Sequence, residues 1–169
     1  MSSADKRPSR KAGSAARVRD FLEANGVADG LQTFEQSTKT ARDAADAMGC
    51  DLGQIVKSLV FRVDDDVVLA LVAGDRRGDA AAIAAETGGS KARLADADTV
   101  RAATGYAIGG VSPFDLPADV LVLIDDSLER FETVYPAAGT PTSMVRMDRS
   151  DLLRLSGGRT ACISHEAGA

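Results

Sequence analysis

The chain has 169 residues, enough for one domain with a sizeable core, and its 44% apolar content excludes a disordered protein. Aromatic residues make up only 4% and Trp is absent, so we expect a core built from Val, Leu, Ile and Ala. The net charge is −5, but residues 1–19 carry six basic side chains and one acidic side chain, which leaves 14 basic and 24 acidic groups in the rest. Such an acidic body argues against broad binding along a nucleic-acid backbone, where neutralisation of phosphates supplies most of the affinity.

The folded domain is expected at residues 15–164, with a tail at each end. Residues 1–14 are basic and predict a flexible tail, either a solvated extension or an arm that touches phosphates; a mitochondrial transit peptide is a weaker interpretation. Residues 165–169 are expected to form a C-terminal tail. No secretory signal or apolar run of transmembrane length is found. Cys50 and Cys162 form neither a metal-ligand spacing nor a disulfide framework, which favours a reduced cytoplasmic setting and no membrane partner.

Hydrophobic periodicity and turn residues predict a mixture of helices and strands. In chain order these are a helix at 15–26, a strand at 31–36, a helix at 38–49, a hairpin of 51–63 and 67–75 around the acidic turn 64–66, a helix at 77–89, a strand at 90–95, a helix at 96–105, strands at 118–128, 129–139 and 142–147, a helix at 148–158 and a strand at 159–164. The order is neither strict βαβ alternation nor all-β. We therefore expect a single α+β domain with a mixed sheet surrounded by helices.

Several common catalytic groups are missing from the sequence. The one histidine, His165, lies near the C-terminus, where a solvated side chain is the simplest interpretation. Histidine-dependent triads and His-rich metal sites are therefore not expected, and the phosphate-binding signatures GxxxxGK[ST] and GxGxxG do not occur. An enzyme with this sequence would work without imidazole, metal or a nucleotide-binding fold, so we expect no cofactor.

Lys57 is the ionisable residue with the most unusual position. It interrupts the apolar stretch IVKSLVF, and on a strand it shares a face with Leu59 and Phe61. A lysine on an apolar face is costly unless its amine reaches solvent or has a task. The pattern leaves both interpretations open, a functional lysine and a lysine that snorkels at a strand edge.

The loop GYAIGGVSPFDLP at residues 105–117 concentrates residues with special backbone conformations. Gly109 and Gly110 allow positive φ and close approach of another molecule, while Pro113 biases Ser112 towards an extended conformation. Such a loop is either a structural turn or a surface that aims backbone N–H groups at an anion or a developing oxyanion.

Three segments together resemble the YbaK/prolyl-tRNA synthetase-associated domain family. They are IVKSLVF at 55–61, GYAIGGVSPF at 105–114 and the closing region that begins FETVYPAAGTPTSM at 131 and runs to 164. The resemblance covers residues 15–164 and implies a YbaK-like α+β fold with a largely antiparallel, partly barrel-like sheet. It also implies an aminoacyl-tRNA deacylase, free-standing or inserted in a synthetase, that edits mischarged tRNA.

The resemblance assigns roles to particular positions. It implies catalytic roles for the lysine of the KS/KT step and for the GxxxP loop, which fall on Lys57, Gly109, Gly110 and Pro113. It implies substrate binding by Phe34, Ser58, Val111, Ser112, Ala137, Ala138 and Gly139. Two departures bear on activity and substrate: Asp115 stands where many members have Gly, and Ala137–Ala138 replace a segment that often holds a serine. The histidine of the alanine-selective branch has no match, which favours the free-standing branch that resembles Cys-tRNA(Pro) deacylases.

The expected substrate is therefore the acceptor 3′ end of tRNA(Pro) carrying Cys or another small amino acid, with prolyl-tRNA synthetase or an elongation factor as a further partner. The loop would hold the ester, and Lys57 would supply positive charge or bind the terminal nucleotide. Water, or the thiol of a cysteinyl substrate, would be the nucleophile. Two alternatives remain, a module that binds the acceptor end without catalysis and a domain that docks on a synthetase.

Overall fold

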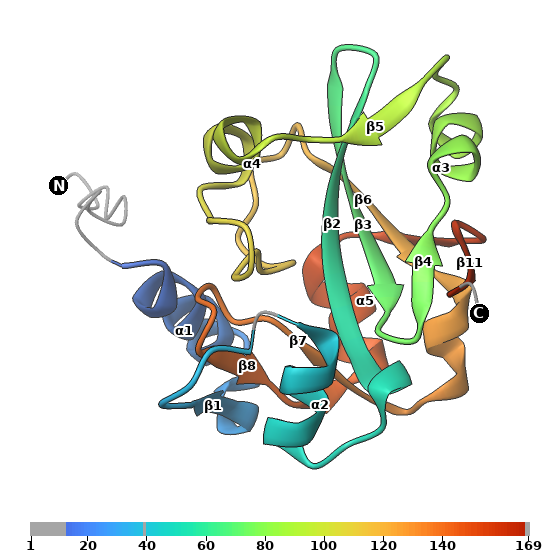
Figure 1. Cartoon of the computed structure of the whole chain (residues 1–169). Coiled ribbons are helices and arrows are strands. Elements are labelled where there is room, and N and C mark those ends of the chain that lie inside the picture. The colour runs from blue at the N-terminus through green and yellow to red at the C-terminus, as the bar shows by residue number, and fades with distance from the viewer. Residues whose placement is uncertain (1–12, 39, 168–169) are drawn as a thin grey trace, which may run out of the picture.

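The computed structural model describes residues 13–38 and 40–167, and its two longest strands form a central hairpin (Figure 1). The helices are α1 (Ser14–Ala24), α2 (Ala41–Met48), α3 (Ala80–Thr87), α4 (Ala97–Thr104) and α5 (Arg149–Ser156), with 3-10 turns η1 (Ala28–Gly30), η2 (Leu52–Gln54) and η3 (Asp126–Arg130). The strands are β1 (Leu31–Thr33), β2 (Ile55–Val63), β3 (Asp66–Ala73), β4 (Arg76–Gly78), β5 (Ala92–Leu94), β6 (Leu121–Asp125), β7 (Thr133–Pro136), β8 (Ser143–Val145), β9 (Met147–Asp148), β10 (Arg159–Ala161) and β11 (Ser164–Glu166). In the part of the chain that the structure describes, no helix is long and apolar enough to cross a membrane.

The main sheet is mixed, which confirms the predicted α+β fold class. Its strand order is β10-β6-β3-β2-β7-β9, and β5 pairs with the far end of β2. The pairs β10–β6, β6–β3 and β2–β7 are parallel, whereas β2–β3, β2–β5 and β7–β9 are antiparallel. Two further antiparallel pairs, β1–β8 and β4–β11, flank this curled, half-barrel sheet.

All five expected helices are present, and the differences lie in short strands. β4 occupies residues expected at the start of the third helix, because that helix begins only after its cap Asp79, whose side chain accepts a hydrogen bond from the Ala82 N–H. β11 extends the fold into the expected C-terminal tail, since its His165 pairs in register with Arg77. The expected N-terminal tail lies outside the described residues as far as position 12, and Ser14 already belongs to α1.

The two faces of the sheet bury different clusters. One face packs Val56, Val60 and Leu71 against the loop at 105–117, whose Tyr106 and Phe114 are the largest fully buried side chains. The other face packs residues of β2 and β3, such as Phe61, beneath α3. The loop at 105–117, for which the sequence leaves open a structural turn or a binding surface, is therefore also part of the core.

Asp125, at the end of β6, joins three segments through a buried carboxylate. It accepts hydrogen bonds from the Ile163 N–H at 2.9 Å, from the Ser164 hydroxyl at 2.7 Å and from both the N–H and hydroxyl of Ser127. Burial raises the pKa of Asp125, but these hydrogen bonds outweigh burial and hold the pKa below its ordinary value.

We expect Asp125→Ala to lower the free energy of unfolding by about 3 kcal/mol, because it leaves several buried donors without an acceptor. Urea denaturation measures this, with the exposed neighbour Asp126→Ala as the control. Since the folded-state pKa is depressed, the contribution is fully present above the unfolded pKa and is lost as pH falls through the folded pKa. An Asp125→Asn protein whose acid unfolding midpoint equals that of the wild type would contradict this role.

Candidate functional site

The site forms where one edge of β2 has no strand partner among the described residues. The pairing with β7 ends at Val56 and Pro136, and the pairing with β5 begins at Phe61 and Leu94. Pro136 has no N–H and cannot extend the ladder. Between these two pairings, the Val60 carbonyl accepts a hydrogen bond from the Ala95 N–H at 2.9 Å, so the backbone groups of Val60 point to this edge. Because backbone direction alternates along a strand, those of Ser58 point there as well.

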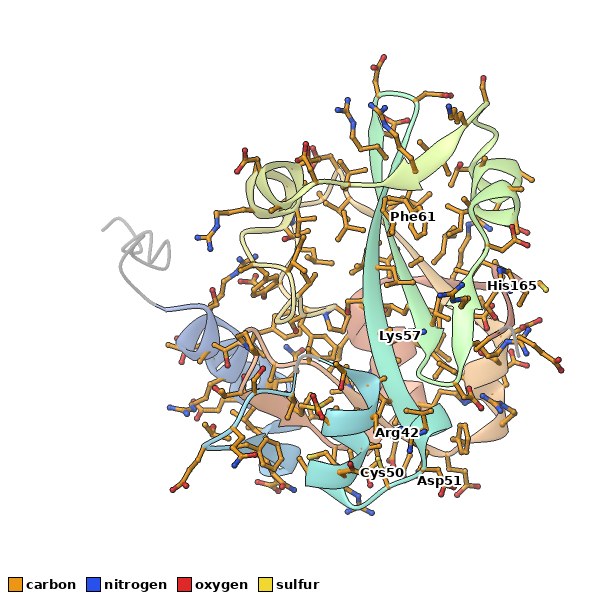
Figure 2. The ribbon with its side chains drawn as sticks, in the orientation of Figure 1. Arg42, Cys50, Asp51, Lys57, Phe61 and His165 are labelled. Atoms are coloured by element: carbon orange, nitrogen blue, oxygen red, sulfur yellow. The ribbon has the colours of Figure 1, made fainter. Side chains whose placement is uncertain are left out.

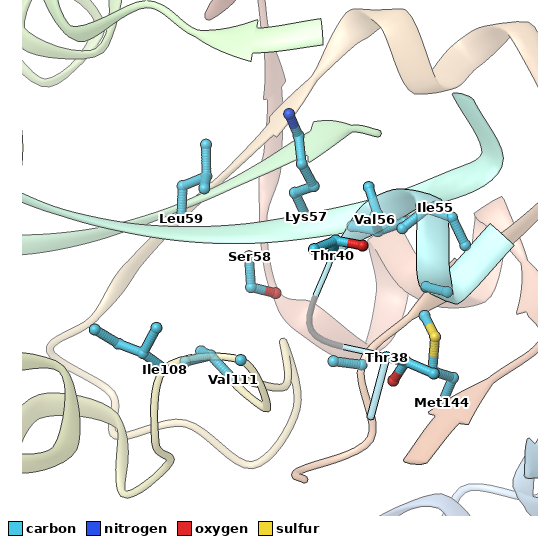
Figure 3. Close-up of a pocket in the computed structure, with 14 residues that line it drawn as sticks. Thr38, Thr40, Ile55, Val56, Lys57, Ser58, Leu59, Ile108, Val111 and Met144 are labelled. Atoms are coloured by element: carbon cyan, nitrogen blue, oxygen red, sulfur yellow. The ribbon is translucent and has the colours of Figure 1, made fainter. Parts of the chain in front are cut away.

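A pocket of about 340 Å³ opens beside this unpaired edge (Figure 3). Its walls come from the start of α2, from both faces of β2, from the loop that contains Gly109 and from the turn after β7. Among the predicted site residues, the pocket brings together Lys57, Ser58, Gly109, Val111 and Ala137. The others, which do not line it, are Phe34, Gly110, Ser112, Pro113, Ala138 and Gly139.

Lys57 and Ser58 point to opposite sides of β2, and Figure 3 shows Ser58 on the side of Ile108 and Val111. Lys57 lies on the face of Leu59, as the sequence predicted, and β4 crosses this face: a Cβ on Gly78 would lie 3.0 Å from Leu59 Cδ1. The Lys57 ammonium group donates a hydrogen bond to the carbonyl of Arg76 in β4. Burial lowers the pKa of Lys57 and the nearby Arg77 lowers it further, although Asp75 acts in the opposite direction.

The position of this lysine is fixed by a chain of contacts from the buried Asp125. The Arg76 guanidinium donates from Nε to Ser164 Oγ at 2.6 Å, and Ser164 Oγ in turn donates to Asp125. β4 is thereby held in place by β11, and the Arg76 carbonyl is presented to Lys57. The side chain is therefore a partly buried cation in a defined direction, and not a freely solvated lysine.

Ser58 supplies unsatisfied polar atoms at the pocket. Its Oγ is buried and has no hydrogen-bond partner in the part of the chain that the structure describes. Its backbone groups face the unpaired edge, as the hydrogen bond at Val60 indicates. Buried polar groups in folded proteins nearly always have partners, so a residue of this kind at a pocket wall points to a ligand.

The GxxxP loop (residues 105–117, with the GxxxP string at 109–113) has a tip that lines the pocket and a base that packs inside the domain. Gly109 has φ of +95° and lines the pocket together with the buried Val111. Neither N–H makes a hydrogen bond with another described residue, so both are available to a ligand. The Gly110 N–H, in contrast, donates to the Ala107 carbonyl at 3.0 Å, and a Cβ on Gly110 would lie 2.7 Å from Thr140 Cα.

The remaining predicted residues support the site from behind. Ser112, Pro113 and Ala138 are buried away from the pocket. Gly139 has φ of +98° and packs against α1, since a Cβ there would lie 2.6 Å from the Ser14 carbonyl oxygen. Phe34 is only partly buried and packs on a small cluster that joins α2 to β2, β7 and β8 and includes Met144.

The sequence interpretation missed several residues that line the pocket. They are Thr38, Thr40, Ala41, Ala44, Ile108 and Met144. Thr40 also caps α2, since its Oγ1 accepts a hydrogen bond from the Asp43 N–H at 3.0 Å. Thr38 donates its hydroxyl proton to the Pro141 carbonyl at 2.7 Å, a contact across 103 residues that no local pattern predicts.

The geometry agrees with what the chain resembles in sequence and in structure. A family model of the aminoacyl-tRNA editing domain matches residues 35–155. YwhH of Bacillus subtilis, an uncharacterized protein, is 41% identical over 124 residues, which are 73% of this chain and 78% of that protein. The multifunctional Ser/Thr-tRNA deacylase ProXp-y of Escherichia coli is 33% identical over 113 residues, 64% of this chain and 68% of that protein.

A solved structure matches nearly the whole chain. It is described as a candidate trans-editing enzyme for prolyl-tRNA synthetase, and it superposes with a TM-score of 0.83 at 37% identity, covering 93% of this chain and 99% of that one. The family model spans both the lysine of β2 and the complete GxxxP loop, and residues of both line the pocket. The chain therefore belongs to the aminoacyl-tRNA editing domain family.

Proposed function

We propose that this protein hydrolyses the ester bond of a mischarged aminoacyl-tRNA in trans, and that the pocket at the β2 edge receives the aminoacylated 3′ end. The observation that supports this most directly is the unsatisfied polar lining of the pocket. The Ser58 hydroxyl on one wall and the N–H groups of Gly109 and Val111 on the other have no hydrogen-bond partners among the described residues. An amino acid in ester linkage offers a carbonyl oxygen and an ammonium group to such a surface.

The reaction itself asks little of the protein. Water adds to the ester carbonyl carbon, the bond to the ribose oxygen breaks, and that oxygen takes a proton, which releases the amino acid and the tRNA. An ester is already activated, so positioning and stabilisation of the developing negative charge supply the main effect. Gly109 and Val111 are assigned to this oxyanion, and the Lys57 cation adds positive potential at the pocket edge or holds the terminal nucleotide. With a cysteinyl substrate, its own thiol is a second nucleophile: it attacks the ester carbon, the bond to the ribose oxygen breaks, that oxygen takes the thiol proton, and water then opens the cyclic thioester.

The lining of the pocket favours a small amino acid that bears a hydroxyl or thiol group. Ala41, Ala44 and Met144 restrict the apolar side, whereas Thr38, Thr40 and Ser58 contribute hydroxyl groups. Ile108, which is 57% exposed, offers an apolar surface at the mouth for the terminal base. The proposed substrate is therefore tRNA(Pro) carrying Cys. Serine and threonine, which the name of ProXp-y includes, are proposed as further amino acids that the pocket accepts.

The acidic charge of the protein favours delivery of the aminoacyl-tRNA by a partner protein. Residues 20–169 are acidic, so affinity for free tRNA is expected to be weak, and prolyl-tRNA synthetase or an elongation factor would bring the substrate to this protein in the cytoplasm.

The test is a deacylation assay with tRNA(Pro) charged with Cys, Ser, Thr, Ala or Pro. We expect rapid release of at least one small amino acid and no release of proline. Stoichiometric binding of the charged tRNAs without turnover of any of them would replace this proposal with the non-catalytic module that binds the acceptor end. Binding to the synthetase alone would favour the docking domain.

Ser58→Ala separates binding from folding. Removing a buried hydroxyl without a partner is expected to leave the free energy of unfolding unchanged or to raise it by about 1 kcal/mol, while KM for the preferred substrate rises about tenfold. The matched control is Ser143→Ala, because the buried Ser143 hydroxyl donates to the Ala138 carbonyl at 3.1 Å and its loss is expected to lower stability. A Ser58→Ala protein with normal KM would contradict substrate binding by this residue.

A further inference from the structure

One side chain of α1 joins the two ends of the GxxxP loop. Arg17 donates from Nη1 to the carbonyl of Thr104 at 3.2 Å and from Nη2 to the carbonyl of Asp115. Its Nε forms an ion pair with Asp115 Oδ2 at 2.8 Å. The guanidinium also lies over the Tyr106 ring, 4.4 Å from its centroid. A single planar group therefore bridges the residue before the loop and a residue near its end.

Both ends of the loop have positive φ where the Arg17 guanidinium contacts them. Gly105 has φ of +79°, and a Cβ there would lie 2.4 Å from Arg17 Nη1, so the absence of a side chain makes room for the guanidinium. Asp115 has φ of +54°, in the left-handed region where a residue other than glycine costs about 1 kcal/mol. Glycine would adopt this φ without strain, and Asp115 contributes a carboxylate for Arg17 instead.

The loop between these ends is rigid at its base. The Tyr106 hydroxyl donates to the Phe114 carbonyl at 2.7 Å, and the Phe114 ring stacks on Phe21 of α1 with 5.7 Å between centroids. The tip with Gly109 and Val111 projects from this base to the β2 edge. A change in how the two ends are held is therefore transmitted to the N–H groups that face the substrate.

We propose that Arg17 is a positioning residue for the reaction, which sets the GxxxP loop at its catalytic distance from β2 without touching the substrate. Arg17 does not line the pocket, and it precedes the region that the family model matches, residues 35–155. This inference rests on the proposed deacylase function. It adds α1 to the catalytic apparatus, through a contact between residues 98 positions apart.

The test compares Arg17→Ala with Arg19→Ala, a matched control that removes an exposed arginine from the same helix. We expect Arg17→Ala to lower kcat about tenfold with little change in KM, at a temperature well below its unfolding midpoint. Arg17→Lys keeps the charge but cannot bridge two carbonyls and a carboxylate, so partial rescue is expected. Asp115→Gly, which removes the ion pair with Arg17 but keeps both carbonyls and relieves the positive φ, is expected to lower kcat by less than Arg17→Ala does.

A second measurement needs no substrate and therefore remains valid if the proposed function fails. Amide hydrogen exchange in residues 106–112 of Arg17→Ala is expected to increase at least about tenfold, whereas exchange in β2 and β3 stays unchanged. Faster exchange with normal kcat would reduce Arg17 to a structural residue and overturn the proposal. Lower kcat with unchanged exchange would overturn the loop as the route of the effect, and no change in either would overturn both.

Discussion

Lys57→Met is expected to lower kcat/KM for deacylation by at least about 100-fold, the size of effect seen when one preorganised charge or donor is removed from an active site. The variant is expected to fold normally, because methionine retains an apolar side chain of similar length on the face of β2 that carries Leu59. The assay is single-turnover deacylation of the preferred aminoacyl-tRNA, together with thermal unfolding. Lys91→Met, which changes an exposed lysine just before β5, is the control and should leave both values unchanged.

The pH dependence gives an independent measure of the same residue. Because burial and Arg77 lower the pKa of Lys57, its charge is lost at a lower pH than for an ordinary lysine, whose pKa is 10.5. Activity, corrected for spontaneous ester hydrolysis, should therefore decline on the alkaline side before pH 10.5 is reached. Between the folded and unfolded pKa values the unfolded state binds more protons, so this lysine makes stability rise with pH in that window. The Lys57→Met protein should lack both effects, and an unchanged alkaline decline would exclude Lys57 as its source.

The parts of this site that the sequence predicted are those with a local signal. A lysine within an apolar strand is visible in seven residues, and a loop with three glycines and two prolines is visible in thirteen. The structure confirms the face of Lys57 and brings it to the same pocket as Gly109 and Val111 (Figure 2 shows Lys57 in the middle of β2). The roles in catalysis remain predictions.

The parts that could not be predicted depend on contacts between distant residues. The open edge of β2 exists because β7 and β5 pair with separate ends of that strand, and register between distant strands is not written in local periodicity. The three-residue strands β4 and β11 have too few residues for an alternating pattern, although together they hold the Arg76 carbonyl that binds Lys57. Phe34 and Gly139, to which the resemblance assigned substrate binding, do not line the pocket and support the fold beside it.

Gly109→Ala is the second substitution for which we expect a large effect, a decrease in kcat/KM of about 10- to 100-fold. Gly109 has φ of +95°, which an alanine adopts only with strain. Alanine relaxes towards negative φ, and this rotation re-aims the adjacent peptide groups, including the N–H groups that face the substrate. The stability cost is expected to be about 1 kcal/mol, the ordinary penalty for a side chain in a left-handed conformation. The measurements are single-turnover deacylation and urea denaturation.

Gly157→Ala provides the control, because it imposes a similar backbone penalty at a distance from the pocket. Gly157 ends α5 with φ of +68°, and a Cβ there would meet no atom within 4 Å. We expect the two variants to lose similar amounts of stability, whereas only Gly109→Ala loses activity. Equal activity in both folded variants would mean that the backbone conformation at Gly109 serves the fold alone, and the oxyanion would then have to be assigned to the Val111 N–H alone or to groups outside the GxxxP loop. Because the Gly110 N–H is already bonded to Ala107, the loop itself offers no neighbouring glycine N–H to take over that role.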